Sequence, residues 1–436
     1  VQMAIYKSLN NKITVPLQGN IGFLYPLSLS NNSRLNKMKR EEFDAKVELL
    51  FKEHKQLIER QNIKKSGGNG LYDRYLYPVL TRDHTPLFWR YDLDYNTNPH
   101  LMTRLGINTT FNAGAIKLNG KYCLAVRTEG FDVKSFFAVA ESPNGIDQWR
   151  FRDHPIVMPV TDDPEMNVYD IRLTQHEDGW IYGLFCAERK DMSKPDDSSA
   201  ALASCGIART RDLDRWERLD DLVSTAAQQR NCVLHPQFVK GRYMIYTRPQ
   251  SGFIETGDSG ISAGFCDNME HAVLGEEILV DSRKYHTVKE VKNGQGPSPI
   301  RTEHGWIHLA HGVRRTAAGL RYTLYLLLTA LDEPWRVIRR PSGHFIEPLD
   351  EERVGDVSNV VFSNGWIADD DGTVFVYYAS SDTRMHVATT TMEKLIDYVL
   401  NTPEDAGRTQ LCAAQRDQMI EKNLKILSLK YPNIKF

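Results

Sequence analysis

The segment Gly241-Arg-Tyr-Met-Ile-Tyr-Thr-Arg248 combines a turn glycine, an apolar and aromatic strand, and a charge at the end of that strand. The chain of 436 residues repeats this combination five times, and apolar runs also precede and follow each glycine. The glycines follow one another at intervals of 59, 62, 64 and 67 residues, and they are Gly120, Gly179, Gly241, Gly305 and Gly372. A near-constant period with this content is typical of a repeat architecture.

Each unit of about 60 residues holds enough sequence for about three or four antiparallel strands. A sheet of that size cannot bury both of its faces alone, so the units are expected to stack around a common axis. We therefore predict an all-β fold, a five-bladed β-propeller over residues 71–395. A pair of ordinary β-sandwiches with chance spacing is the alternative, because junctions of glycine and aromatic residues are common in all-β chains.

Helical segments flank the predicted propeller. Residues 1–70 are expected to form a polar leader and an N-terminal helix that begins after Met38, and residues 396–436 to form a C-terminal helical segment. The N-terminal helix has one apolar stripe, made of Phe43, Val47, Leu50, His54, Leu57 and Ile58. We expect this stripe to dock on the propeller or on a partner subunit. The C-terminal part predicts helices near 392–400 and 415–427, and homo-oligomerisation through the terminal helices is a further expectation.

Composition and charge narrow the class of ligand. The formal net charge is −2 and the chain has no run of lysine or arginine, which argues against a nucleic-acid partner.

No stretch reaches the roughly 18 apolar residues of a membrane span, although a short apolar patch at 21–26 leaves a signal peptide as an alternative. The six cysteines show no C-x-x-C spacing, which favours buried thiols in a reducing, cytoplasmic compartment over disulfides or a metal site.

Polar side chains near the predicted innermost strands are the first candidates for a site, because these strands surround the central funnel of a propeller. Related places in the five units hold Asn112, Asp170, His235, Ser298 and Asn359. Asp170 stands out because aspartate is disfavoured in strands, and its structural alternative is a simple turn aspartate. The second strands end in charge, at Arg127, at Glu188 with Arg189, at Arg248, at His311 with Arg314, and at Asp382 with Arg384. A solvated rim is the alternative role for these charges.

The balance of acids and bases favours one kind of chemistry. Most glycosidases need two carboxylates, one as acid and one as base or nucleophile, and only Asp170 stands out here. Arginine is abundant by contrast, with Arg209 and Arg230 in the second and third units. Guanidinium groups match phosphate oxygens in a bidentate way. One acid beside a cationic pocket predicts attack by phosphate, which is already nucleophilic and needs no general base.

The order of motifs over residues 71–395 resembles the mannoside phosphorylases of glycoside hydrolase family 130. The strings that carry the resemblance include Phe111-Asn-Ala-Gly-Ala-Ile-Lys117, Asn167-Val-Tyr-Asp-Ile-Arg172, Gly206-Ile-Ala-Arg209, Gly294-Gln-Gly-Pro297 and Tyr378-Ala-Ser-Ser-Asp-Thr383. This resemblance implies a five-bladed propeller and an inverting phosphorolysis of 4-O-β-D-mannosyl-D-glucose to α-D-mannose 1-phosphate and glucose. It implies no cofactor and no metal, with inorganic phosphate as the co-substrate.

The same resemblance assigns roles to single residues. Asp170 is the implied proton donor, acting through the 3-hydroxyl of mannose. The implied phosphate ligands are Arg209, Arg230 and His311, the implied mannose ligands are Asn112, Arg127 and Asp382, and the residues implied on the glucose side are Glu188 and Arg189. Two alternatives stay open. A β-mannoside hydrolase on this fold needs a carboxylate base to activate water, and a non-catalytic sugar-binding propeller is expected to lack the acid at position 170.

Overall fold

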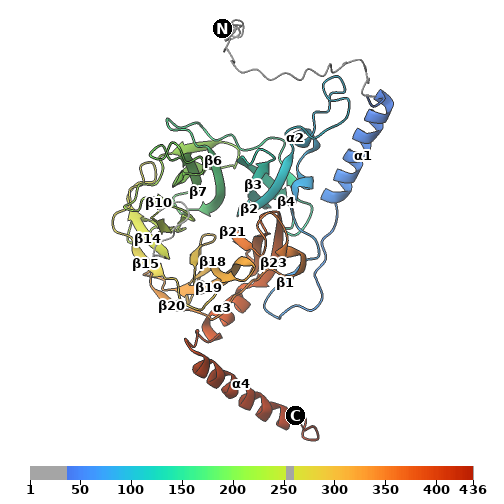
Figure 1. Cartoon of the computed structure of the whole chain (residues 1–436). Coiled ribbons are helices and arrows are strands. Elements are labelled where there is room, and N and C mark those ends of the chain that lie inside the picture. Colours follow the sequence, from blue (N-terminus) through green and yellow to red (C-terminus); the bar gives the residue numbers. More distant parts are fainter. Residues whose placement is uncertain (1–36, 252–259, 436) are drawn as a thin grey trace, which may run out of the picture.

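The computed structural model describes residues 37–251 and 260–435, and five of the six sheets that its strands form are arranged in a ring (Figure 1). The ring confirms the predicted five-bladed β-propeller, and the two-sandwich alternative is wrong. Almost the whole predicted leader lies outside the described residues. Each blade is an antiparallel sheet whose first strand runs beside the axis.

The first two blades are regular four-stranded sheets. Blade 1 consists of β2 (Ile107–Leu118), β3 (Lys121–Gly130), β4 (Ser135–Ser142) and β5 (Arg150–Phe151). Blade 2 consists of β6 (Asn167–Gln175), β7 (Ile181–Lys190), β8 (Ala201–Thr210) and β9 (Trp216–Leu219). The turn glycines between the first two strands of each blade have φ of +77° and +87°, a conformation that glycine adopts without strain.

Blades 3 and 4 have shorter innermost strands. Blade 3 consists of β11 (Val233–Leu234), β12 (Tyr243–Thr247), β14 (Ile261–Cys266) and β15 (Ile278–Asp281), beside the small ladder of β10 (Gln228–Gln229) and β13 (Pro249–Gln250). Blade 4 consists of β16 (Lys292–Gln295), β18 (Gly305–Thr316), β19 (Gly319–Thr329) and β20 (Val337–Arg339), and β17 (Ile300–Thr302) also pairs with β18. The innermost layer is therefore less regular here than the repeat predicts.

Blade 5 closes the ring with a strand from the other end of the chain. It consists of β21 (Val361–Ala368), β22 (Thr373–Ser380), β23 (Arg384–Thr391) and, at its outer edge, β1 (Asp73–Arg74). Because β1 precedes blade 1 in sequence, its pairing with β23 joins the first and last parts of the propeller.

The hydrophobic core consists of five clusters, one between each pair of neighbouring blades. Leu173 and Phe185 of blade 2 pack with Ile116 and Phe137 of blade 1, for example. Each sheet therefore buries both faces against its neighbours, which is why the units form a ring and not separate sheets.

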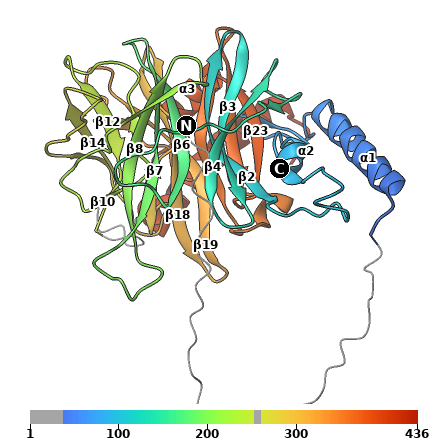
Figure 2. The same cartoon turned by 90° about the horizontal axis from the view of Figure 1, so that it is seen from above.

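The helices lie outside the ring. They are α1 (Arg40–Ile58), α2 (Leu87–Arg90), α3 (Met392–Asn401) and α4 (Thr409–Lys430), with 3₁₀ turns η1 (Arg82–His84) and η2 (Asp350–Arg353). Figure 2 shows α1 beside α2 at the side of the propeller. Phe43 of α1 is buried and packs edge-on against Tyr95, at 5.4 Å between ring centroids. The predicted docking of this helix on its own chain is thus confirmed.

The two C-terminal helices differ in how they pack. α3 buries Leu395 and Val399 in the cluster between blades 4 and 5. α4, all of which the structure describes, buries no side chain and extends away from the ring (Figure 1). Both helices were predicted from the sequence, and only the first belongs to the packed body.

Candidate active site

One cavity of about 210 Å³ lies at the axis of the ring, and all five blades contribute to its wall. The wall consists of Asn112, Arg127, Tyr169, Asp170, Cys186, Arg230, Asn231, Arg248, Lys292, His311, Tyr322, Val357, Val360, Phe362 and Asp382. Two carboxylates and several cations share this small space, which makes the cavity the candidate active site.

Asp170 is held at the axis by an irregularity in its strand. The register of β6 against β7 shifts between Tyr169 and Arg172, and Asp170 has a φ of +60°, in the left-handed region. Its Oδ1 accepts hydrogen bonds from Asn112 Nδ2 at 2.9 Å and from Arg127 Nη1 at 3.3 Å. The carboxylate therefore has a fixed direction into the cavity, paired with one cation and one amide.

Arg127 is itself tightly held. Its Nη2 forms an ion pair with Glu129 at 2.9 Å, and its Nε donates to Ser135 Oγ at 2.9 Å. The guanidinium carbon lies 4.3 Å from the ring centroid of Phe111 and 4.8 Å from that of Tyr169. These contacts leave Arg127 little freedom, so its position beside the acid is preorganised.

Asp382 is the second carboxyl group in the wall. It follows β22 in a turn with a φ of +51°. Burial, together with the negative charge of Asp170, raises the pKa of Asp382 to about 7, although Arg127 acts in the opposite direction. Near neutral pH this group therefore carries a proton for much of the time and is able to donate a hydrogen bond to a sugar hydroxyl.

Arg230, Arg248, Lys292 and His311 form the part of the wall that we call the cationic end. Burial, with the neighbouring charge of Arg230, lowers the pKa of Arg248 to about 10. Burial, with the charges of Arg248 and Arg230, lowers the pKa of Lys292 to about 8. In the described part of the chain no carboxylate compensates Arg248 or Lys292. Desolvated cations of this kind favour a bound anion.

His311 is the neutral member of the cationic end. Its side chain is almost fully buried, and burial, followed by the charges of Arg248 and Arg172, lowers its pKa well below its ordinary value of 6.5. Its Nε2 lies 3.5 Å from Asn231 Nδ2, and its Nδ1 has no hydrogen-bond partner among the described residues. A neutral ring that accepts from Asn231 carries its proton on Nδ1, which is then a donor for an anion.

A glycine makes room for this ring. A Cβ at Gly294 would lie 2.5 Å from His311 Cε1 and 2.6 Å from Asn231 Nδ2. The close approach explains physically why the string at 294–297 begins with glycine.

The structure does not bring Arg209 into the cavity, which corrects the predicted phosphate role. Its Nε pairs with Glu217 at 2.7 Å and its Nη2 with Glu270 at 3.0 Å, and its guanidinium carbon lies 4.4 Å from the Trp180 ring. Arg209 therefore links the outer strands of blade 2 to the connection between β14 and β15 of blade 3, and two carboxylates already balance its charge.

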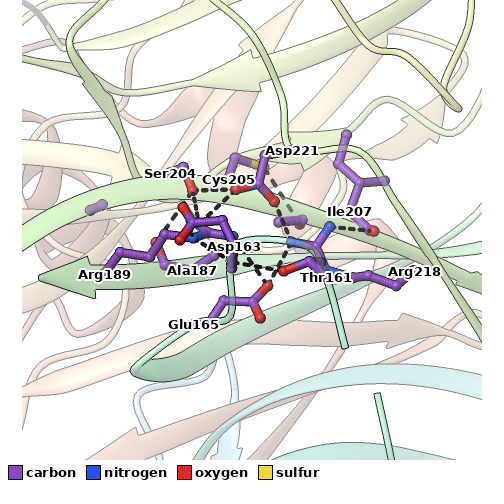
Figure 3. A network of polar contacts seen from close by, with 12 residues as sticks. Thr161, Asp163, Glu165, Ala187, Arg189, Ser204, Cys205, Ile207, Arg218 and Asp221 are labelled. Atoms are coloured by element: carbon purple, nitrogen blue, oxygen red, sulfur yellow. Dashed lines mark hydrogen bonds and ion pairs between the residues drawn. The ribbon is translucent and has the colours of Figure 1, made fainter. Parts of the chain in front are cut away.

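Glu188 and Arg189 lie beside the cavity and outside its wall. Glu188 Oε2 accepts from the hydroxyl of Tyr169 at 3.0 Å, so it contacts a residue of the wall. Figure 3 shows Arg189 in a network of acids. Its Nε pairs with Asp163 at 2.9 Å and its Nη1 with Asp221 at 2.8 Å. This network joins the 161–165 loop to blade 2.

Two further expectations need correction, because the innermost strands of blades 3 and 4 differ from the predicted ones. His235 lies beyond β11, is buried, and shares a hydrogen bond with the carbonyl of Gln237 at 2.9 Å. Ser298 lies beyond β16, and its hydroxyl donates to the carbonyl of Leu234 at 3.1 Å. Both side chains belong to the scaffold.

Sequence reasoning gave no site role to several polar residues of the wall, among them Asn231, Arg248, Lys292 and Tyr322. Arg248 ends a second strand, as Arg127 does. This equivalent position is the sequence feature that could have assigned Arg248 to the site. Lys292 stands two residues before the Gly294-Gln-Gly-Pro297 string, and Tyr322 lies within a long apolar run. No pattern in the sequence singles out these last two residues.

The sequence also matches a family of known proteins. The family model described as "beta-1,4-mannooligosaccharide phosphorylase", for glycoside hydrolase family 130, matches residues 80–401. A 4-O-β-D-mannosyl-D-glucose phosphorylase from Bacteroides fragilis is 59% identical over 387 residues, which cover 88% of this chain and 99% of that protein. The chain belongs to glycoside hydrolase family 130.

Two more distant relatives are similar to parts of this chain. A β-1,4-mannooligosaccharide phosphorylase from Ruminococcus albus is 34% identical over 197 residues, which cover 44% of this chain and 57% of that protein. The structure of a β-1,2-mannobiose phosphorylase from Listeria innocua superposes with a TM-score of 0.60 at 18% identity, over 78% of this chain and 99% of that one. At this identity the superposition shows the shared propeller alone.

Residues 37–251 and 260–435 contain no group of three or more histidine, cysteine, aspartate or glutamate side chains arranged to hold a metal ion. In the same residues, no helix has the length and apolar character that crossing a membrane requires.

Proposed function

We propose that this member of family 130 cleaves 4-O-β-D-mannosyl-D-glucose with inorganic phosphate, and forms α-D-mannose 1-phosphate and D-glucose with inversion at C1 of mannose. The observation that carries the proposal is the union, in one axial cavity, of the Asp170 carboxylate with Arg248 and Lys292, two cations that no described carboxylate compensates. The printed name of the 59% identical relative supports the choice of this disaccharide.

The proposed reaction transfers one proton and exchanges one bond at C1. Asp170 acts in its protonated form: it gives its proton to the 3-hydroxyl of mannose, and the proton of that hydroxyl passes to the glycosidic oxygen. The bond between C1 and this oxygen breaks while an oxygen of phosphate bonds to C1 from the opposite face. Glucose leaves as a neutral molecule, and the inverted centre is α-D-mannose 1-phosphate. The reverse reaction uses the same groups.

We assign the binding roles by position in the wall. Arg230 and His311 are proposed as phosphate ligands, and Arg248 and Lys292 join them because they share the cationic end. The proposed mannose ligands are Asn112, Arg127 and Asp382. Glu188 and Arg189 are proposed to shape the glucose side indirectly, Glu188 through Tyr169 and Arg189 through the 161–165 loop. Arg209 has no part in this assignment.

A hydrolase on the same fold fits the cavity less well. An inverting hydrolase needs a base that activates water about 6.5–9.5 Å from the acid. The other carboxyl group of the wall, Asp382, is assigned to mannose in this proposal, and the cationic end offers arginine, lysine and His311, whose pKa burial lowers far below the range of an effective base. A non-catalytic sugar-binding propeller does not require an acid held in a left-handed backbone conformation, as Asp170 is.

The direct test is the release of glucose from mannosyl-glucose with and without phosphate. We expect release only with phosphate, and equal release in both tubes would refute phosphorolysis.

Asp170→Asn is expected to lower kcat by about 10²–10⁴-fold, the usual contribution of a general acid, while sugar binding survives. Asp267→Asn, at an exposed aspartate after β14, is the matched control and should keep the wild-type rate. A wild-type rate in Asp170→Asn would show that another group is the acid.

We further propose that the terminal helices mediate homo-oligomerisation. α4 buries no side chain in its own chain, yet it exposes Leu411, Met419, Ile420, Leu424, Ile426 and Leu429. Exposed apolar groups gathered on one projecting helix favour burial against a second copy. Light scattering on the full chain should give the mass of more than one subunit, and a monomer mass would contradict this proposal.

We also propose a reducing compartment, the cytoplasm, as the place where the protein works. All six cysteines are free, and Cys412 is exposed on α4. An exposed thiol persists more readily where disulfide formation is suppressed.

A further inference from the structure

Arg172 is a fully enclosed cation next to the cavity. It lies on β6 two residues after Asp170, and only 1% of its surface is exposed. Its Nη1 donates to the carbonyl of Asp170 at 2.8 Å, and its Nε donates to the carbonyl of Gly296 at 3.0 Å. Its Nη2 donates to Asn231 Oδ1 at 3.1 Å. Among the described residues, no carboxylate forms an ion pair with it.

These partners come from different blades. Asp170 belongs to blade 2, Asn231 precedes the first strand of blade 3, and Gly296 follows the first strand of blade 4. The guanidinium carbon also lies 5.8 Å from the ring centroid of Phe362 in blade 5. One buried side chain thus joins the inner ends of four blades at the axis.

Two of the groups that Arg172 contacts, a backbone carbonyl and a side-chain amide, belong to the two halves of the proposed chemistry. On one side it holds the carbonyl of Asp170, whose left-handed φ persists only if its surroundings fix it. On the other side it binds the amide oxygen of Asn231, which turns the amide nitrogen toward His311 Nε2. Without the guanidinium, neither the backbone of the acid nor the amide that orients His311 keeps its present partner.

We propose that Arg172 is a positioning residue that fixes the proton donor relative to the phosphate ligands. It acts through Asp170 and Asn231 and does not line the cavity itself, so it is not a catalytic residue. The inference rests on the proposed phosphorolysis, because it assumes that protonation of the leaving group by Asp170 and capture of phosphate near His311 belong to one reaction.

The test compares two substrates that differ in their need for a proton. Glucose leaves from mannosyl-glucose only with protonation, whereas the dinitrophenolate of 2,4-dinitrophenyl β-D-mannoside leaves without it. With mannosyl-glucose, Arg172→Met is expected to lower kcat on the order of 100-fold, the usual effect of a misplacement of about 1 Å. With the aryl mannoside the loss should be at least tenfold smaller, because the misplaced acid is no longer needed.

The phosphate KM is the second readout. Since Asn231 loses its partner, KM for phosphate should rise about tenfold in Arg172→Met, while KM for the sugar stays near wild type. Arg172→Lys keeps the charge and one or two of the donors, so it should recover part of kcat, and it decides the question if the methionine variant does not fold. Arg152→Met is the matched control, because Arg152 pairs with Glu141 and Asp214 away from the cavity. This control should keep the wild-type ratio of the two substrates.

Other outcomes would overturn the proposal. Equal loss on both substrates with an unchanged phosphate KM in the folded variants would assign Arg172 to the scaffold alone, and wild-type kinetics would leave it no role. Failure of the proposed function itself would look different, because the wild-type enzyme would then release glucose equally with and without phosphate.

Discussion

Replacing Arg74 with methionine is expected to destabilise the propeller at the point where its first and last parts meet. β1 pairs with β23 through two residue pairs only, Asp73 with Thr389 and Arg74 with Ala388. Side-chain contacts must therefore add to this closure. The strongest of them is the ion pair between Arg74 and Glu352, whose side chains are 8% and 6% exposed.

The size of the expected loss in unfolding free energy follows from the ion pair that Glu352 loses in Arg74→Met. Besides Arg74, its oxygens accept from the hydroxyl of Tyr378 at 2.8 Å and from the backbone nitrogen of Leu349 at 3.0 Å. Arg74→Met removes the only described cation paired with this carboxylate and leaves a buried charge with two neutral donors. Breaking one partner of a buried pair costs about 3–5 kcal/mol, so the free energy of unfolding should fall by that amount.

Equilibrium unfolding in urea, followed by circular dichroism and tryptophan fluorescence, measures this change. Lys64→Met is the matched control, because Lys64 pairs with Asp73 of the same strand at 60% and 43% exposure and should cost about 1 kcal/mol or less. The double variant Arg74→Met with Glu352→Leu should recover part of the loss, since no uncompensated charge remains. The reasoning is refuted if Arg74→Met stays within about 1 kcal/mol of wild type, or if the double variant loses as much as the two single variants together.

Two further predictions concern the cationic end and the contact between blades. Burial lowers the pKa of Lys292 to about 8, so its charge is present below that pH and is lost above it; KM for phosphate should therefore rise as pH increases through 8. In Lys292→Arg the KM should stay constant up to about pH 9.5, because arginine remains charged, and a constant KM in the wild-type enzyme would contradict a phosphate role for Lys292. A Cβ at Gly365 would lie 2.6 Å from the Cβ of Ala115 in blade 1, so Gly365→Ala should cost about 1–3 kcal/mol in urea unfolding. At Gly275 the described atoms leave a Cβ open space, and Gly275→Ala is the control; equal stability of the two variants would show that blades 1 and 5 are less closely packed at this point.

The fold was predictable because a glycine turn precedes the second strand of each blade, and the sequence shows these turns. Gly120, Gly179, Gly241, Gly305 and Gly372 all have positive φ, from +77° to +144°, and each stands at or just before the start of a strand. A tight antiparallel turn needs this backbone conformation, and glycine adopts it at the lowest cost. The repeat therefore marks the turns directly, and the number of blades follows from counting them.

Site residues on the innermost strands were predictable only where that strand is long. In blades 1 and 2 the strands β2 and β6 are long, and the predictions of Asn112 and Asp170 at the axis agree with the structure. In blade 3 the innermost strand has two residues, so the apolar pattern that located His235 described a loop and not a strand facing the axis. Local periodicity cannot show where such a short strand ends.

Arg209 shows a second limit. Its partners are Glu217, eight residues away, and Glu270, 61 residues away in the next blade. The motif that contains Arg209 resembles the family, and the resemblance alone cannot distinguish a ligand of phosphate from an arginine balanced by acids of a neighbouring sheet. Only the three-dimensional arrangement of blades 2 and 3 supplies that information.

Backbone conformation marks part of the site. Asn112, Asp170, Asn231 and Asn359 have φ of +45°, +60°, +53° and +66°, and each of these residues costs about 1–3 kcal/mol in that conformation. The first three line the cavity and the fourth precedes Val360, which lines it too. Asparagine and aspartate tolerate the left-handed region better than other side chains with a β-carbon, so a unit that must turn a polar group toward the axis uses one of them. In a propeller sequence, an asparagine or aspartate near the start of successive units is therefore one signal of the site, beside charges at the ends of second strands such as Arg127 and Arg248, which also line the cavity.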